Sequence, residues 1–443
     1  MAHFPRRSLA AIVAGMTLHA AGAQAQMPDD ADRPVHTENV EVLAHVELGD
    51  PLSVSDIELE QDMNRPFAYV GRMFVHGFDI IDLRDPANAK VLHSWRIEDA
   101  ELHTGTGMMD GKLFKDGGRW YYVQSTQFQQ GGPDSDLGAV IFDVTGLPDI
   151  STVKEVARIR APETPGGFHN IFMYKHSDGR PLLITTTNGA YAAVYDMRKV
   201  VSGQDGAVGR VPIPEGISEQ MPNFGYHDMY AAYDPATGKD KFYGGGAGGY
   251  HIYDITTPEQ PAHLFSIANN PTIPWGHTFT PTPDGRYAVA EVEYQYQPLR
   301  IFDLQPGQTG QTKVISQPVG AWTADWRNLV HNHEVRWPYV FVSGYEDGMQ
   351  VFDMRDPANP KTIGYWDTYL GEPSIGMCSD RKCNGAFGVD IRNADGLIVV
   401  SDMTTGFWAM RLDGFDGWNG ADHGMPNISS VQNWDNGPVK PAT

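Results

Sequence analysis

The chain has 443 residues, enough for two or three average domains or for one large repetitive all-β domain. Acidic residues outnumber basic ones, 55 against 33, and the formal net charge is −22. This balance argues against a nucleic-acid partner, whose affinity rests on phosphates neutralised by Lys and Arg, and against an anionic membrane surface. The 48 glycines and 31 prolines favour β structure with many turns.

The first residues have the pattern of an export signal. Arg6 and Arg7 precede an apolar run, and small residues at 23–25 offer a cleavage site, so residues 1–25 are predicted to be a secretory signal peptide. Both Sec and twin-arginine export remain open. No later segment is apolar for long enough to span a bilayer, so we expect a soluble periplasmic or secreted protein. Residues 26–37 are predicted to be a linker.

A repeated pattern organises most of the remaining chain. GFDIIDLRDPANAKVLHSW at 77–95 matches GMQVFDMRDPANPKTIGYW at 348–366, with an apolar strand that ends in Asp, a turn, and a second apolar strand. Weaker copies follow the same order. The aligned positions are Asp82, Asp143, Asp196, Asp254, Asp303, Asp353 and, degenerately, Arg411. Copies spaced about 50–60 residues apart are typical of the four-stranded blades of a β-propeller.

The last copy stops after its third strand. Residues 38–48, ENVEVLAHVEL, resemble the fourth strands of the other copies and are predicted to complete this blade. A blade built from both termini would close the ring and remove its exposed edges. We therefore predict an all-β fold, a seven-bladed β-propeller over 38–414, followed by an irregular C-terminal tail at 415–443. Two β-sandwiches in tandem would explain neither the repeats nor the complementary termini.

The motifs IIDLRDPANAK and VFDMRDPANPK resemble those of the LVIVD-repeat β-propeller family. The resemblance covers most of the mature chain and implies the propeller fold. It implies little about function, because propellers of this kind serve many roles.

Five of the predicted blades carry a histidine where the innermost strand begins. A residue at this position points toward the central channel, so the five imidazoles should converge on one face. Neutral imidazole is a common ligand of Zn, Fe, Cu and Mn, and three or four converging imidazoles make a metal site. The predicted ligands are His103, His169, His227, His277 and His333. The alternative is a ring of structural histidines that donate hydrogen bonds to neighbouring blades.

The sequence VHNHEV at 330–335 holds two histidines. His333 aligns with the predicted ring, and His331 lies two residues earlier. Side chains at i and i+2 share one face of a strand, so both could bind the metal. We favour His331 as a group above the metal, close to the substrate.

The loops between the second and third strands are expected to open on the same face. They supply Glu293, Tyr345 and Glu346, and a carboxylate or tyrosine above a metal can act as a general acid or base. Together with His331 these are the predicted catalytic residues. Each is also a residue type that forms ordinary turns.

Cys378 and Cys383 are the two cysteines of the chain. In an oxidising compartment this short loop favours a disulfide. Zinc binding is less favoured, because no second CxxC or HxxxH pair lies nearby. The sequence also lacks the Walker A, GxSxG and CxxCH motifs.

We therefore expect a metal-dependent enzyme, a lyase, hydrolase or oxygenase, that uses a divalent transition metal (Zn, Fe, Mn or Cu) on a small-molecule or oligomeric organic substrate. Propeller lyases and oxygenases that hold a metal with axial histidines are analogies. The alternative is a non-catalytic exported scaffold whose loops bind a partner. The reaction class and the oligomeric state stay open.

Overall fold

The computed structural model describes residues 34–217, 225–325, 328–370, 384–426, 433–435 and 437. The predicted signal peptide and the cysteine pair lie outside the described residues, so the disulfide stays a prediction. The chain divides into two units, Met1–Val35 and His36–Thr443, and the fold below is that of the second unit.

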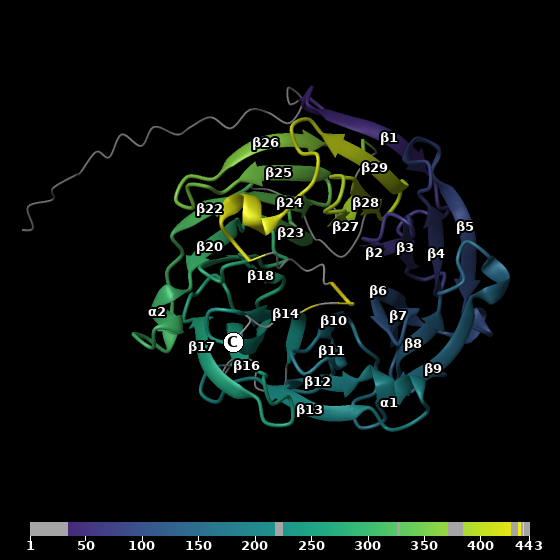
Figure 1. Cartoon of the computed structure of the whole chain (residues 1–443), viewed down its shortest axis with the longest axis horizontal. Coiled ribbons are helices and arrows are strands. Elements are labelled where there is room, and N and C mark those ends of the chain that lie inside the picture. The colour runs from purple at the N-terminus through teal and green to yellow at the C-terminus, as the bar shows by residue number, and fades with distance from the viewer. Residues whose placement is uncertain are drawn as a thin grey trace, which may run out of the picture. The chain divides into compact units, whose positions relative to one another are not determined.

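The second unit is a seven-bladed β-propeller, which confirms the predicted fold (Figure 1). Neighbouring strands within each blade are antiparallel, and the first strand of each blade lies nearest the axis. Blades one to three are formed by β2 (Val54–Leu59), β3 (Phe67–Arg72), β4 (Gly77–Asp82) and β5 (Lys90–Arg96); by β6 (Gly105–Asp116), β7 (Arg119–Phe128), β8 (Leu137–Asp143) and β9 (Lys154–Arg160); and by β10 (Ile171–Lys175), β11 (Pro181–Thr185), β12 (Tyr191–Asp196) and β13 (Ala207–Pro212).

Blades four to seven continue in the same order. They are formed by β14 (Tyr226–Asp234), β15 (Lys239–Gly246), β16 (Gly249–Asp254) and β17 (Ala262–Ala268); by β18 (Phe279–Pro281), β19 (Tyr287–Ala290), β20 (Leu299–Asp303) and β22 (Gly320–Trp322); by β23 (Asn332–Arg336), β24 (Tyr339–Ser343), β25 (Met349–Asp353) and β26 (Lys361–Trp366); and by β27 (Ala386–Ile391), β28 (Ile398–Asp402), β29 (Gly406–Leu412) and β1 (Val40–Val46). The short helices are η2 (Pro86–Asn88), η3 (Ala100–Leu102), η4 (Ile150–Thr152), α1 (Met197–Val201), α2 (Gln305–Gln308) and η5 (Gly420–His423).

The N-terminal strand closes the ring, as predicted. Strand β1 pairs with β29 from Val40 opposite Leu412 to Val46 opposite Phe407, and it is the outer strand of blade seven. Just before β1, the backbone N–H of Thr37 donates to the carbonyl of Tyr365 at 3.1 Å, so the same segment also holds blade six.

The repeated aspartate has a structural role. In six blades it is the last residue of the third strand, and its carboxylate accepts a hydrogen bond from the backbone N–H two residues later; examples are Asp82 with Arg84 at 3.1 Å and Asp353 with Arg355 at 2.8 Å. An Asp side chain that bonds the backbone two residues on stabilises a turn. The repeat therefore records where each blade turns from its third strand to its fourth.

Blade five departs from the expected pattern. The order of the repeat predicts a second apolar strand after the turn at Asp303, but α2 follows Asp303 and the fourth strand is β22. Residues Val314–Ile315, which form β21, instead pair in parallel with the outer strand β17 of blade four. The insertion thus covers an outer sheet edge of the neighbouring blade.

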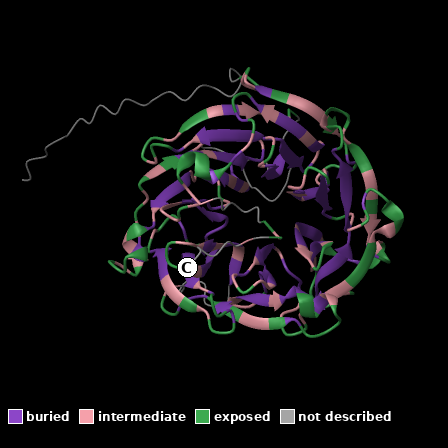
Figure 2. Ribbon diagram, in the orientation of Figure 1, coloured by how far each residue is buried: buried purple, intermediate pink, exposed green. Residues whose placement is uncertain are grey.

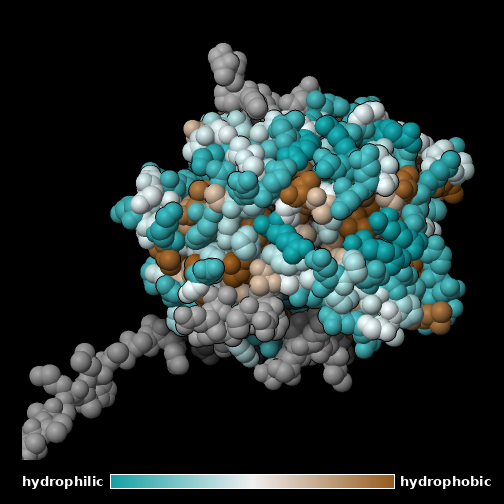
Figure 3. Space-filling view, turned by 90° about the horizontal axis from the view of Figure 1, so that it is seen from below, coloured by the Kyte–Doolittle hydropathy of each residue, from teal (hydrophilic) through white to brown (hydrophobic). Residues whose placement is uncertain are grey.

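The core lies between the faces of adjacent blades. All residues of β3 and β4 are buried, whereas the outer strand β5 is mostly half-buried or exposed, a contrast that Figure 2 shows around the ring. The side of the molecule in Figure 3 is mainly hydrophilic, with apolar side chains in small groups. Within the described part of the chain, no helix has the length and apolar character needed to cross a membrane.

Candidate metal centre

Four imidazoles lie in a row on the face where the second and third strands of each blade are joined. The ring centroids of His169 and His227 are 4.5 Å apart, those of His227 and His277 4.2 Å, and those of His277 and His331 5.1 Å. The four histidines come from blades three to six. We call them the histidine row.

Each of these histidines stands at the start of the innermost strand, and its backbone is tied to the blade. The N–H of His277 donates to the carbonyl of Glu291 at 3.1 Å, and the N–H of His331 donates to the carbonyl of Ser343 at 3.0 Å. In blade four the pairing shifts between Tyr226 and Asp228, so a β-bulge presents His227.

The structure brings together three of the five predicted ligands and replaces one. His331, not His333, is the histidine of blade six that continues the row. His333 is buried inside β23, opposite Val342, and no ring contact joins it to the row among the described residues. The histidine that continues the row thus lies two residues before the predicted one, and metal binding by His333 stays a prediction.

His103 lies in a different place. Its Nδ1 is 3.1 Å from the carbonyl oxygen of Asp99 and its Nε2 is 3.2 Å from the carboxylate of Asp134. Its ring faces Phe128 at 4.3 Å and His76 at 6.2 Å. Strand β6 is longer than the other inner strands, so His103, which precedes it, stands among the loops of blades one and two. In blade two the position of the row is held by Met109, which precedes the cavity residue Asp110.

Three imidazoles of the row are oriented through Nδ1. The Nδ1 of His169 lies 3.0 Å from Oε1 of Gln127, that of His331 lies 2.7 Å from the carbonyl of Phe387, and that of His277 is hydrogen-bonded to the carboxylate of Glu291. A carbonyl or carboxylate oxygen can only accept, so Nδ1 carries the hydrogen in His277 and His331. Nε2 is then the nitrogen of these two rings that can bind a cation when the ring is neutral.

Glu293 brings a carboxylate to the row. A ligand atom from each of His227, His277 and Glu293 lies within 4.8 Å of the other two, and this is the one such group of histidine, cysteine and carboxylate atoms among the described residues. The Nε2 of His277 is 3.6 Å from Glu293 and has no hydrogen-bond partner. Tyr345, which is fully buried and 5.3 Å from His331, donates its hydroxyl hydrogen to Glu293.

Glu346 follows Tyr345 in the loop between β24 and β25 and is half-buried. The structure therefore places Glu293 and Tyr345 next to the row, whereas Glu346 belongs to the same loop cluster without a described contact to an imidazole.

Burial controls the protonation of the row. Burial lowers the pKa of His169 to about 4, and burial together with the neighbouring imidazoles lowers those of His227 and His331 well below the ordinary value. For His277 burial acts in the same direction, but the carboxylates of Glu291 and Glu293 outweigh it and raise its pKa to about 9. Three rings are therefore neutral near pH 7, and Glu291 shares a proton with the fourth.

The loops of this face hold strained backbone. Eight non-glycine residues have a positive φ among the described residues, and all eight lie in loops of this face; they include Phe74 at 58°, Tyr296 at 62° and Tyr345 at 48°. A left-handed conformation of such a residue costs about 1–3 kcal/mol and tends to occur at functional sites. The clustering favours this face as the functional one.

Sequence reasoning missed two of the polar groups that support the row, Glu291 and Gln127. Glu291 lies two residues before Glu293, and alternation along a strand end places both carboxylates on one side. The pattern Glu-Val-Glu was thus a usable signal. Gln127 gave none, because it lies 42 residues from His169 in the sequence.

Comparisons with known proteins identify the fold and no family. The chain matches no protein family and no curated protein. Among solved structures it is similar to Raptor from Chaetomium thermophilum, with a TM-score of 0.55 and 13% identity, and the match covers 85% of this chain and 29% of the Raptor chain. The chain thus spans less than a third of that protein, and at this identity the likeness shows the propeller fold alone.

Proposed function

We propose that His169, His227, His277 and His331, with Glu293, bind a divalent transition metal ion, and that the protein is a metal-dependent enzyme acting on a small or oligomeric organic substrate. The observation that carries this proposal is the buried, unpartnered Nε2 of His277, which stands beside His227 and Glu293 within 4.8 Å. A buried polar atom without a partner costs about 1–3 kcal/mol, and a metal ion would offset that cost.

The surroundings of the row support this assignment. Metal-binding histidines commonly donate their other ring hydrogen to a carboxylate or carbonyl, which fixes the tautomer. Glu291 and the carbonyl of Phe387 occupy these positions at His277 and His331. Neutral imidazoles are also the form that binds metal, and burial keeps three of the four rings neutral.

Several imidazoles with one carboxylate suit Zn, Fe, Mn or Cu better than Mg or Ca, which prefer oxygen ligands. A bound ion of this kind would act as a Lewis acid toward a substrate oxygen. Glu293 and Tyr345 already share a hydrogen bond at the same place, so this pair can accept or return a proton beside the substrate.

Export also belongs to the proposal. The N-terminal Arg-Arg and apolar run favour a periplasmic or secreted protein, and the LVIVD-type repeats favour membership of that propeller family. N-terminal sequencing of protein recovered from the periplasm should give a start near residue 26. Retention of residues 1–25 in the cytoplasm would contradict export without touching the metal site.

The test is metal content by inductively coupled plasma mass spectrometry, on wild-type protein and single alanine variants. Wild-type protein should carry close to one equivalent of one transition metal. His331→Ala should lose most of it, whereas His333→Ala should keep it if the variant folds. His93→Ala, in the outer strand β5, is the matched control and should behave as wild type.

Metal-free wild-type protein that gains no metal on incubation with Zn, Fe, Mn or Cu would refute the proposal. The alternative of an exported scaffold would then stand. Equal metal loss from His331→Ala and His333→Ala, with both variants folded, would refute the assignment of the row.

A further inference from the structure

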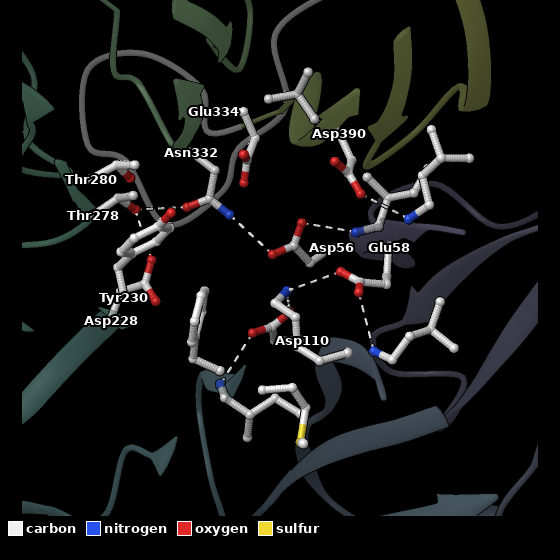
Figure 4. Close-up of a pocket in the computed structure, with 18 of the residues that line it drawn as sticks. Asp56, Glu58, Asp110, Asp228, Tyr230, Thr278, Thr280, Asn332, Glu334 and Asp390 are labelled. Carbon is white, nitrogen blue, oxygen red and sulfur yellow. Dashed lines mark hydrogen bonds and ion pairs between the residues drawn. The ribbon is translucent and has the colours of Figure 1, made fainter. Parts of the chain in front are cut away.

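A partly open cavity of about 120 Å³ lies on the propeller axis, next to the histidine row (Figure 4). Asp228, Thr278 and Asn332 line it, and each directly follows a histidine of the row in the sequence. The polar lining of the cavity differs from the histidine row: it consists mainly of carboxylates and hydroxyls, with Lys112, His333 and two side-chain amides. We call this cavity the axial cavity.

The axial cavity is strongly acidic. Seven carboxylates line it, against a single ammonium group, that of Lys112; the carboxylates belong to Asp56, Glu58, Glu60, Asp110, Asp228, Glu334 and Asp390. Glu60 is already paired with Arg65 at 2.6 Å. Figure 4 shows all of the carboxylates except Glu60, on the inner strands of several blades and around a common centre. Concentrated charge of one sign in such a cavity favours a ligand of the opposite charge.

The cations of the protein neutralise only some of this charge. Lys112 lies 2.5 Å from Asp110 and 3.9 Å from Glu58. Arg336 reaches the next pair, at 2.6 Å from Glu334 and 3.6 Å from Asp390.

Asp56 and Asp228 have no ion-pair partner within the described chain. Asp56 accepts hydrogen bonds from the backbone N–H of Ile57 at 2.8 Å and from the side-chain amide of Asn332 at 3.1 Å. Asp228 accepts from the N–H of Met229 and from the hydroxyl of Thr278. When the two carboxyl groups are ionised, neutral donors of this kind supply no counter-charge.

Two hydroxyl groups give a second, independent indication of a ligand. Tyr230 and Thr280 line the cavity and are each only 6% exposed, yet neither hydroxyl has a hydrogen-bond partner among the described residues (Figure 4). The imidazole of His333 also lines the cavity, is 3% exposed, and has no hydrogen-bond partner on either ring nitrogen, whereas buried polar atoms are normally satisfied. A bound molecule with hydrogen-bond donors would satisfy both hydroxyls.

The spacing of the carboxylates selects the kind of cation. No three of these carboxylates bring ligand atoms within 4.8 Å of one another, so they do not form a direct coordination shell for a bare metal ion. The wall between them is apolar, with Ile57, Phe172, Met173 and Phe279. A cavity of about 150 Å³ takes a six-carbon ring, so this one has room for about six non-hydrogen atoms.

We propose that the axial cavity binds a small aliphatic amine cation, best matched by a short diamine whose methylene groups meet the apolar wall and whose ammonium groups pair with Asp56 and Asp228. The ammonium hydrogens also reach the hydroxyls of Tyr230 and Thr280. This binding needs no metal, so it stands or falls separately from the proposed metal centre.

The test is isothermal titration calorimetry on the whole chain after treatment with EDTA, at about pH 8.5, where the carboxyl of Asp56, with a pKa raised by burial to about 8, is ionised. The probes are 1,4-diaminobutane, the uncharged 1,4-butanediol and calcium chloride. The diamine should bind at one molecule per chain, and the diol and calcium should not bind.

Variants locate the binding. Asp56→Asn should weaken diamine binding by at least about tenfold, and Tyr230→Phe by about threefold or more, since a charged hydrogen bond contributes more than a neutral one. Glu47→Gln, which removes one exposed carboxylate far from the cavity, should leave the affinity unchanged within about twofold.

Calcium binding in place of the diamine would overturn the proposal in favour of an inorganic cation site. Diamine affinity that is unchanged in both Asp56→Asn and Tyr230→Phe would also overturn it, by placing the binding outside the cavity. If circular dichroism shows that Asp56→Asn does not fold, Tyr230→Phe decides alone. Diamine binding in EDTA-treated protein would support the cavity even where no transition metal is ever found.

Discussion

The substitution Val40→Ala tests whether the N-terminal strand holds the ring closed. Val40 is the first residue of β1, is 5% exposed, and contacts both Leu412 of blade seven and Gly364 of blade six. Val40→Ala removes two methyl groups, each contributing about 0.8 kcal/mol to stability, and leaves a small cavity. The free energy of unfolding should fall by about 2 kcal/mol.

For a propeller of this size the entropy of unfolding is about 0.8 kcal/mol per degree, so a loss of about 2 kcal/mol should lower the melting temperature by about 2–3 °C. Differential scanning calorimetry resolves such a shift. Val91→Ala is the matched control, because Val91 lies on the outer strand of blade one and is 39% exposed. Its melting temperature should change by less than about 1 °C.

Deletion of residues 34–48 extends the test. It would expose the edge of β29 and the apolar surface beneath β1, and soluble folded protein should no longer be obtained. If Val40→Ala is no more destabilising than Val91→Ala, or if the deleted protein melts like wild type, then β1 does not hold the ring closed and the reasoning fails.

Three further predictions follow from buried charge. Arg72→Ala should lower the free energy of unfolding by about 3–5 kcal/mol in urea titrations, because it leaves the buried Asp79 with only the partly exposed Arg96 as partner. Arg84→Ala breaks an exposed ion pair and should lower it by less than about 1 kcal/mol. Burial raises the pKa of Asp56 from 3.8 to about 8, so the folded state holds this proton more tightly than the unfolded state. The stability that this proton contributes should be fully present below about pH 4 and be lost as the pH rises through about 8, and Asp56→Asn should flatten this part of the slope in pH-dependent melting curves. Glu291→Gln should weaken metal binding by about 10–100-fold in chelator competition without unfolding the protein, as is usual for a carboxylate that orients a metal-binding histidine.

The fold could be predicted because its signal is local and repeated. In six of the seven blades an aspartate at the end of the third strand bonds the turn that follows, so the same residue recurs at the same place in the repeat. Closure was also visible, because the outer strand of a blade has a characteristic half-buried pattern that residues 38–48 share. Seven such signals reinforce one another, and the architecture follows from their sum.

The histidine row could be predicted only in part, because its register depends on loop length. The distance from each histidine to the repeated Asp varies with the loop between the second and third strands, so counting back from Asp353 did not separate His331 from His333. A better signal was present. His227, His277 and His331 are each followed by a small polar residue that lines the axial cavity, and His333 is followed by the longer Glu334.

The axial cavity was missed although its carboxylates follow a simple pattern. Asp56 and Glu58, like Asn332 and Glu334, are two residues apart, so they share one face of an inner strand. What sequence could not reveal is the end wall of the cavity. Trp434, in the predicted irregular tail, lines it, and this contact spans most of the chain length.

The seven blades share one fold, but the site on the axis is asymmetric because one residue position differs between the blades. One position at the start of each inner strand is His in blades three to six, but Phe387, Ser55 and Met109 in blades seven, one and two. Met109 and Phe387 pack with Tyr345 and other side chains in an apolar cluster that closes this side of the axis and touches His331 through Phe387 at 3.6 Å. That cluster removes water from the row, and removal of water is what lowers the pKa of the imidazoles. Four blades therefore supply the imidazoles of the proposed metal site, and the other three supply most of the apolar cluster that helps to keep His331 neutral.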